Sequence, residues 1–222
     1  MPAKLSVIMP TLNAESGLRH ALPPLAAGLE TGLIRELVIS DGGSEDATLR
    51  IADAAGAEIV TGPPSRGGQL RRGATAARGE WFLFLHADSI LPPGWPDMVA
   101  AHMARGGPAA FVLRFDAGGM AGAMVAGWAN MRSRLFSLPY GDQGLLVSRA
   151  DYEAAGGYPD IPLMEDVAIS RALPRITLLP GKVTTSAERY RRDGWMRRGA
   201  GNIWQLLRYL AGADPENLAR RY

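Results

Sequence analysis

The chain has 222 residues, of which 47% are hydrophobic, and 24 basic residues stand against 22 acidic ones. This composition supports one sizeable core, and a net charge of +2 excludes a protein that binds polyanions over its whole surface. Between Arg189 and Tyr222, eight arginines stand against three acidic residues, so this segment suits phosphates or an anionic membrane surface.

The sequence has no cysteine, which excludes disulfides and thiolate chemistry and fits a reducing compartment. Its first ten residues lack the apolar core of a signal peptide. The longest uncharged stretch, 117–131, is glycine-rich and too short to span a bilayer. We therefore expect a cytoplasmic protein that touches a membrane at most peripherally.

The first ninety residues alternate short apolar runs with helical patterns. The runs predict strands at 5–9, which Pro10 is expected to stop, 36–40, 57–60 and 80–85. Helical patterns cover 18–29, 44–55 with Ser44 as N-cap, and 69–78. Because a helix fills each crossover between strands, this order predicts an α/β fold, with a mostly parallel sheet and helices on both faces.

Beyond Pro92 this regular alternation ends. The patterns predict a helix at 95–104, a strand at 110–115, a small-residue segment ending near Leu138, a strand at 145–147, a helical turn at 151–155, and helices at 165–173 and 203–210. We interpret residues 1–222 as one domain, with a nucleotide-binding half (1–90), an acceptor half (91–187) and a helical C-terminal tail (188–222).

Polar residues recur where the predicted strands end: Thr11, Asn13 and Glu15 after the first, Asp41 after the second and Asp88 after the fourth. The carboxyl ends of parallel strands meet at one edge, where open α/β sheets bind ligands. Asp41 and Glu15 could accept hydrogen bonds from a base or ribose, and Asp88 could hold a divalent cation with its phosphates. In the alternative interpretation Thr11 and Asn13 shape a turn and Asp41 caps a helix.

Two further clusters allow a chemical or a structural interpretation. Arg66-Gly67-Gly68 opens a predicted helix, where backbone N–H groups suit phosphate oxygens, or it forms a glycine turn with solvated arginines. Glu165 and Asp166 stand at another helix start, where a carboxylate could act as a general base or simply complement the helix dipole.

Four of these motifs, in this order, resemble family 2 glycosyltransferases over roughly residues 5–185. They are SVIMPTLNAE at 6–15, ISDGGSEDAT at 39–48, the acidic strand end at Asp88, and Met164-Glu165-Asp166. Together, LHADS at 85–89, GDQG at 141–144 and GGYPDIPLMED at 156–166 further resemble a compact bacterial subgroup of that family.

The resemblance implies a GT-A fold, related to the Rossmann fold, and an inverting transferase that is similar to hexosyltransferases. It also implies Mn²⁺ or Mg²⁺ and a UDP- or GDP-type sugar donor. By motif, Asp166 would be the catalytic base with Glu165 beside it, and Asp88 would ligate the metal. The other donor-binding residues would be Pro10, Thr11, Asn13, Glu15, Asp41, Arg66, Gly67, Ala87 and Gln143, the last lying near the donor–acceptor junction.

His86 is a departure, because it replaces the first aspartate of the family's Asp-x-Asp motif. A neutral imidazole can hydrogen-bond the ribose or ligate the metal, but it supplies no negative charge. A structural histidine is the alternative.

The acceptor is an unidentified hydroxyl compound. Trp195, Trp204 and Leu207 belong to an apolar pattern that would either form an interfacial helix for a lipid acceptor or pack on the core or on a second subunit. Two other functions are open: a nucleotidyltransferase, which usually has a glycine-rich, lysine-containing loop after its first strand, and a non-catalytic nucleotide-sugar-binding protein.

Overall fold

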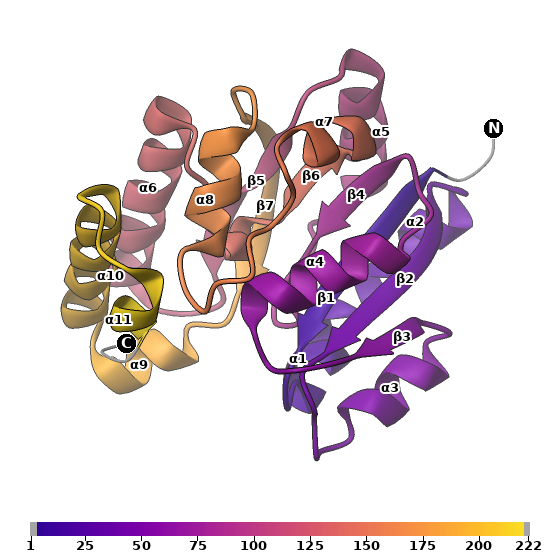
Figure 1. Ribbon diagram of the computed structural model, residues 1–222, viewed down its shortest axis with the longest axis horizontal. Helices are drawn as coiled ribbons and strands as arrows, with labels where there is room; N and C mark the ends of the chain where they lie inside the picture. The colour runs from indigo at the N-terminus through magenta and orange to yellow at the C-terminus, as the bar shows by residue number, and fades with distance from the viewer. Residues whose placement is uncertain (1–3, 220–222) are drawn as a thin grey trace.

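The computed structural model describes residues 4–219, and a seven-stranded sheet lies at its centre (Figure 1). The strand order is β3-β2-β1-β4-β6-β5-β7. The strands are β1 (Leu5–Thr11), β2 (Ile34–Asp41), β3 (Glu58–Thr61), β4 (Trp81–Phe84), β5 (Ala109–Phe115), β6 (Leu145–Ser148) and β7 (Thr177–Thr185). One sheet therefore contains strands from both predicted halves of the chain.

The sheet is mostly parallel, as predicted. β1, β2, β3 and β4 run in one direction, and β5 runs parallel to β7. β6 alone is antiparallel to both of its neighbours, β4 and β5. The parallel register places Thr11 beside Asp41 at the carboxyl ends of β1 and β2.

Helices cover both faces of the sheet, as predicted. They are α1 (Glu15–Ala21), α2 (Ala26–Glu30), α3 (Thr48–Ala54), α4 (Arg66–Ala76), α5 (Trp95–Arg105), α6 (Gly119–Phe136), α7 (Arg149–Ala154), α8 (Glu165–Ala172), α9 (Glu188–Asp193), α10 (Trp195–Leu210) and α11 (Pro215–Ala219), with short 3-10 turns at η1 (Pro23–Leu25) and η2 (Gly141–Gln143). Buried residues of α4, α7 and α8 share one core cluster, on the near face in Figure 1, and those of α1, α5 and α6 share another.

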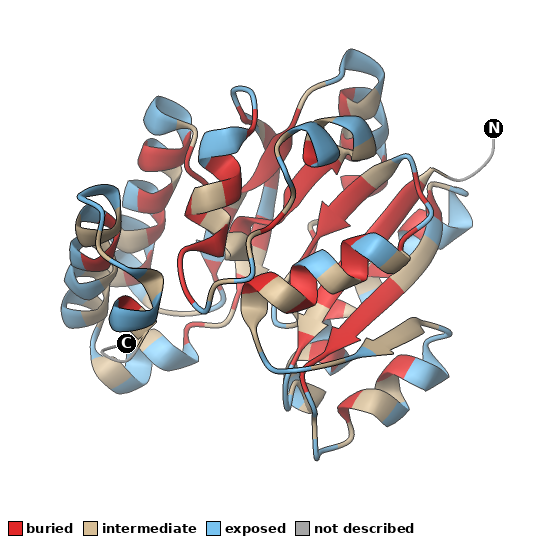
Figure 2. Cartoon of the chain, in the orientation of Figure 1, coloured by how far each residue is buried: buried red, intermediate tan, exposed pale blue. Residues whose placement is uncertain are grey.

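The central strands are apolar on both sides because both faces are covered. In β1, Leu5, Val7 and Met9 belong to one core cluster and Ile8 to the other, and all four are fully buried. Figure 2 shows the result: the central strands are mostly buried, and the exposed residues lie on the helices and loops around them.

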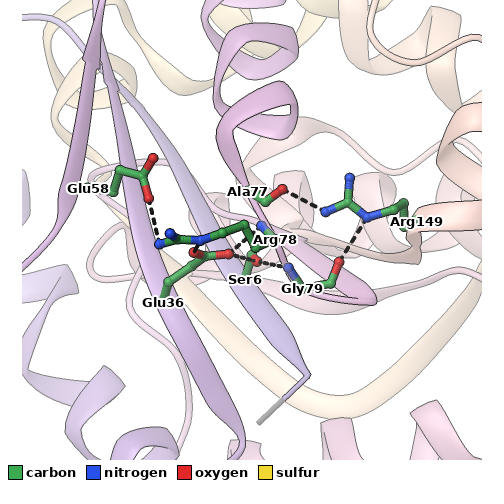
Figure 3. A network of polar contacts seen from close by, with 7 residues as sticks. All are labelled: Ser6, Glu36, Glu58, Ala77, Arg78, Gly79 and Arg149. Carbon is green, nitrogen blue, oxygen red and sulfur yellow. Dashed lines mark hydrogen bonds and ion pairs between the residues drawn. The ribbon is translucent and has the colours of Figure 1, made fainter. Parts of the chain in front are cut away.

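A polar network holds the amino end of the sheet (Figure 3). This is the end opposite the carboxyl edge, where open α/β sheets bind ligands. The Glu36 carboxylate accepts hydrogen bonds from the hydroxyl of Ser6 at 2.6 Å and from the guanidinium of Arg78 at 2.8 Å. Arg149 donates to the carbonyls of Ala77 and Gly79 at 2.6 and 3.0 Å. These contacts fix the turn between α4 and β4.

Several predicted boundaries were wrong. β1 continues through Pro10, which is tolerated because β4 pairs with β1 only as far as Ile8, so no partner needs the missing N–H. Ser44 is not an N-cap: α3 begins at Thr48, and the Ser44 hydroxyl instead donates to Asp41 at 2.6 Å. Prolines at 23 and 24 interrupt the helix predicted at 18–29.

Other elements were missed or too short. The small-residue segment ending near Leu138 contains the 18-residue helix α6, and the helix predicted at 203–210 begins at Trp195. No prediction covered β7, α9 or α11. Within residues 4–219, the helices are too short or too polar for any of them to cross a bilayer.

Candidate active site

The loops after β1 and β2 are joined by hydrogen bonds at the carboxyl edge of the sheet. The Asn13 side chain accepts from the Glu45 N–H at 2.9 Å, and the backbone N–H of Asn13 donates to the Ser44 hydroxyl at 2.8 Å. Glu15 pairs with Arg19 at 2.8 Å. The side chain of Gln69, from α4, donates to the carbonyl of Thr11 at 2.7 Å. The predicted nucleoside-binding residues therefore form one connected surface.

Asp41 is the buried centre of this surface. Its carboxylate accepts hydrogen bonds from the Thr11 hydroxyl, the Ser44 hydroxyl, and the backbone N–H groups of Gly43 and Ser44, at 2.6 to 2.8 Å. Burial by itself would raise the pKa of Asp41, but these four donors outweigh it and hold the pKa below its usual value. Asp41 thus shapes the loop as an anion. It does not cap a helix, as the structural alternative had it, because α3 begins only at Thr48. Its contact with a base stays a prediction.

At the start of α4 the two predicted residues have different surroundings. Gly67 lies so close to the carbonyl of Pro159 that a Cβ would be 2.0 Å from that oxygen, so glycine is required for packing. Arg66 instead extends toward α8, where its Nε lies 3.6 Å from Oε1 of Glu165. Contact of Arg66, or of the backbone at Gly67, with a donor phosphate stays a prediction.

Four carboxylates come together from three separate segments: Asp88 after β4, Asp142 on η2, and Glu165 with Asp166 at the start of α8. The negative charges of Asp88 and Asp166 raise the pKa of Asp142, and the charge of Asp166 raises the pKa of Glu165. The sequence predicted that Asp41, Asp88 and Asp166 gather at one site, and the structure brings only Asp88 and Asp166 of these three toward Asp142. Asp41 lies apart from them, with the nucleoside-binding loops.

The turn η2 connects the segments that carry these carboxylates. Oδ2 of Asp166 accepts a hydrogen bond from the Gly141 N–H at 2.9 Å, and the Ser89 hydroxyl donates to the Asp142 carbonyl at 3.3 Å. Oδ1 of Asp166 accepts from the N–H of Val167 at 2.8 Å. Asp166 is therefore held in one orientation at the N-terminus of α8.

The carboxylates repel one another in surroundings that hold little water. Burial, followed by the charges of Asp88 and Asp166, raises the pKa of Asp142 to about 7. The Asp88 side chain reaches solvent between half-buried and buried neighbours, and the partial burial of its carboxyl still raises its pKa against the charges of Arg189 and Arg66. A cation bound here would offset both the burial of the negative charges and the repulsion between them.

His86 is uncharged in this site. Burial, with the positive charges of Arg66 and Arg189, lowers its pKa to about 3. Its Nε2 is buried without a hydrogen-bond partner among residues 4–219, and it lies so near Gly141 that a Cβ there would be 2.5 Å away. The histidine therefore fills the space beneath η2, which supports the structural interpretation.

The residues fit a divalent cation that takes most of its ligands from phosphates and water. Within the described part of the chain, no three His, Cys, Asp or Glu side chains form a group able to hold a metal. Mg²⁺ is usually bound by one or two carboxylates and by substrate phosphates. Asp88, which follows β4, provides a hard oxygen ligand of this kind.

Two remaining predicted residues have packing roles. Gln143 is fully buried, and its side chain accepts from the Ser133 hydroxyl and donates to the Phe111 carbonyl, at 2.8 and 3.0 Å. Gln143 thus anchors η2 from below. The carbonyl of Ala87 lies against α1, where a Cβ on Gly17 would be 2.6 Å away. Direct contact of either residue with a donor stays a prediction.

The sequence reasoning missed two charged residues near the carboxylates. Asp142 was noted only within the motif near the donor–acceptor junction, and its neighbouring glycines were the available signal. Arg189, whose charge acts on His86 and Asp88, was counted only within the basic tail. It reaches the site because α9 follows β7 directly, and β7 was not predicted.

The fold is that of GT-A glycosyltransferases. S. aureus TarS 1-349 superposes with a TM-score of 0.60 at 16% identity, covering 95% of this chain and 66% of TarS. Glucosyl-3-phosphoglycerate synthase from Mycobacterium tuberculosis, in complex with Mn²⁺, UDP and glucosyl-3-phosphoglycerate, gives a TM-score of 0.54 at 23% identity, covering 83% of this chain and 70% of the synthase.

The chain belongs to glycosyl transferase family 2, whose model matches residues 6–137. Glucosyl-3-phosphoglycerate synthase from Mycolicibacterium paratuberculosis is 31% identical over 141 residues, which are 55% of this chain and 43% of the synthase. The synthase from Mycobacterium tuberculosis is 32% identical over 97 residues, or 40% and 30% of the two chains. This chain thus spans less than half the length of the curated relatives it matches.

Proposed function

We propose that this protein transfers a sugar from a UDP-type nucleotide-diphosphate sugar to an acceptor hydroxyl, with inversion at the anomeric carbon and with Mn²⁺ or Mg²⁺. The observation that carries the proposal is that the Asp142 carboxyl lies within range of the charges of Asp88 and Asp166, and that the positive charges of Arg66 and Arg189 act on Asp88. Membership of family 2 and the UDP and Mn²⁺ in the structurally similar synthase support the same chemistry.

In this proposal Asp88 binds the cation together with the donor diphosphate. The cation would neutralise the charge that builds on the departing nucleoside diphosphate. Arg66 and Arg189 add positive charge on the same side. Thr11, Asn13, Glu15 and the loop that Asp41 organises would hold the nucleoside.

Asp166 is the proposed base. The acceptor oxygen bonds to the anomeric carbon while the bond from that carbon to the diphosphate oxygen breaks, leaving its electron pair on the nucleoside diphosphate. The hydroxyl proton passes to Asp166. Each carboxylate oxygen of Asp166 already accepts one backbone hydrogen bond, which fixes its direction and leaves a second lone pair for the proton.

The alternative functions have less support. A nucleotidyltransferase would usually have a glycine-rich, lysine-containing loop after β1, where this chain has PTLN at 10–13. The uncharged His86 favours a nucleotide-sugar-binding protein without catalysis only if no cation binds beside it. Cytoplasmic location and homodimer formation stay predictions.

A thermal-shift panel of nucleotide sugars, with and without Mn²⁺, tests the proposal. Binding to the folded state raises Tm, so a UDP-sugar should raise Tm further when Mn²⁺ is present. Asp88→Asn should lose the increment that depends on Mn²⁺. The proposal is wrong if no nucleotide sugar shifts the wild-type Tm, or if the Asp88 variant keeps the full increment.

A further inference from the structure

An apolar cavity of about 240 Å³ lies between α6 and α10, beside the carboxylates. At roughly 30 Å³ for a water-sized group, it has room for about eight such groups. Its wall is apolar apart from a few polar groups, and the residues that line it include Met124, Trp128, Arg132, Asp142, Met196 and Gly199.

Two of the polar residues that line the cavity each have a buried atom without a partner. Arg132 is only 4% exposed, its guanidinium stacks 3.3 Å over the Tyr140 ring, and its Nε donates to the Leu138 carbonyl. Its Nη2 is buried and unpartnered among residues 4–219, and so is Oδ1 of Asp142. Buried polar atoms normally have partners. Nη2 of Arg132 can therefore donate to an acceptor group of a ligand, and Oδ1 of Asp142 can accept from a donor group.

The same two helices present apolar side chains to solvent. Six of the twelve large exposed hydrophobic residues in the described chain lie on α6 and four on α10: Met120, Met124, Trp128, Met131, Leu135 and Phe136, then Met196, Trp204, Leu207 and Leu210. Most recur at spacings of three or four residues, so they form one stripe along each helix. Met124, Trp128 and Met196 belong both to these stripes and to the cavity wall.

Positive charge accompanies the stripes. Residues 188–210, which cover α9 and α10, contain six arginines against Glu188 and Asp193. Apolar side chains that reach into the acyl region, with arginines that meet anionic headgroups, are typical of helices lying on a membrane surface. A second copy of this chain would place these arginines against each other and is less favoured.

We propose that the cavity takes the apolar part of the acceptor, a lipid alcohol drawn from an anionic bilayer on which the stripes of α6 and α10 rest. This inference rests on the proposed transferase function, because it names the acceptor class for the same site. The reacting hydroxyl enters past Asp142, which lines the cavity and lies within range of the charge of the proposed base Asp166, and a second oxygen of the lipid accepts from Nη2 of Arg132.

Binding of 1-octanol, an alcohol with a plain aliphatic chain, tests whether the cavity takes the apolar part of a lipid alcohol. Gly199 lines the cavity and Gly201 is exposed with open space around it, both on α10. Titration calorimetry should find octanol bound to the wild type and to Gly201→Leu, and at least tenfold weaker in Gly199→Leu. If Gly199→Leu does not fold, Ala200→Phe replaces it. No binding to the wild type, or equal binding in the cavity variant, overturns the proposal.

Co-sedimentation with vesicles tests whether the stripes of α6 and α10 bind an anionic bilayer. The wild type should sediment with phosphatidylglycerol vesicles at low salt, and Trp204→Glu/Leu207→Glu should lose this binding. Leu29→Glu, at an exposed leucine on α2, should keep it. If the wild type stays in the supernatant, or if gel filtration shows a dimer that the double variant abolishes, the stripes do not bind a membrane. A Tm increment with UDP-sugar and Mn²⁺ is scored separately, so its loss would count against the transferase rather than against the lipid.

Discussion

Oδ2 of Asp166 accepts a hydrogen bond from the N–H of Gly141, 2.9 Å away and 25 residues earlier in the chain. This bond joins the start of α8 to η2. In turn, η2 packs closely on His86, which is possible only because Gly141 has no Cβ. The orientation of the proposed base and the position of His86, two residues before the proposed metal ligand Asp88, are therefore coupled through one glycine.

Replacing Asp166 with Asn should lower kcat by about 10²- to 10⁴-fold, the usual contribution of a general base, because the amide cannot take the acceptor proton. Donor binding should change little, since the Asn oxygen can still accept from Gly141. Turnover and the Tm increment given by UDP-sugar with Mn²⁺ measure the two effects. Asp97→Asn, in the first turn of α5, is the control, and wild-type turnover in the Asp166 variant would exclude this residue as the base.

Replacing Gly141 with Ala should destabilise the protein by about 1–3 kcal/mol, the usual cost of overpacking. The new Cβ would lie 2.5 Å from Nε2 of His86, so η2 must move and kcat should fall with it. Urea unfolding gives the stability and an activity assay gives kcat. Gly127→Ala is the matched control on α6: its Cβ meets no atom, so it should stabilise the helix by about 0.5–1 kcal/mol. Equal stabilities for the two variants would show that the contact with His86 is not tight.

Much of the catalytic half of the site could be predicted from local patterns. Asp88 follows a recognisable strand, and Asp166 lies in the first turn of a recognisable helix. The structure brings both within range of Asp142. Asp142 could not be placed in this way, because it joins them through contacts with Ser89 and through its neighbour Gly141. Such long-range bonds leave no periodic signal in the sequence.

The same limit explains the missed strand and the missed cavity. β7 contains Pro180-Gly181, a typical turn pair, but the sheet accommodates it at a register shift between Ala110 and Val112 of β5. Arg132 directly follows the uncharged small-residue stretch 117–131 on α6, where an arginine would be expected to face solvent. Its burial depends on Tyr140 and Leu138, which only the folded chain places around it.

Glu165 should make the protein less stable as pH rises. Burial, followed by the charge of Asp166, raises the pKa of Glu165 to about 7 from an ordinary value of 4.5. A carboxyl group with a raised pKa in the folded state stabilises it fully below pH 4.5, and this stability is lost as pH rises toward 7. Glu165→Gln should therefore match the wild type near pH 4.5 and exceed it at pH 8 by up to about 3 kcal/mol. Urea unfolding at both pH values measures this, with the exposed Glu153→Gln as control. A difference that does not change with pH would contradict the buried environment of Glu165.

Glu36 should contribute stability without affecting the chemistry, because its network lies at the amino end of the sheet (Figure 3). Glu36→Gln weakens the acceptor of the Ser6 and Arg78 hydrogen bonds and should lower the free energy of unfolding by about 1–3 kcal/mol. Hydrogen bonds hold the pKa of Glu36 below its usual value against the opposing effect of burial, so the wild-type advantage should disappear as pH falls through that lowered pKa. Glu80→Gln breaks only an exposed pair with Lys4 and should change stability by less than about 0.5 kcal/mol. Urea unfolding and kcat per folded molecule distinguish the outcomes: a fall in kcat for Glu36→Gln would mean that the two ends of the sheet are coupled.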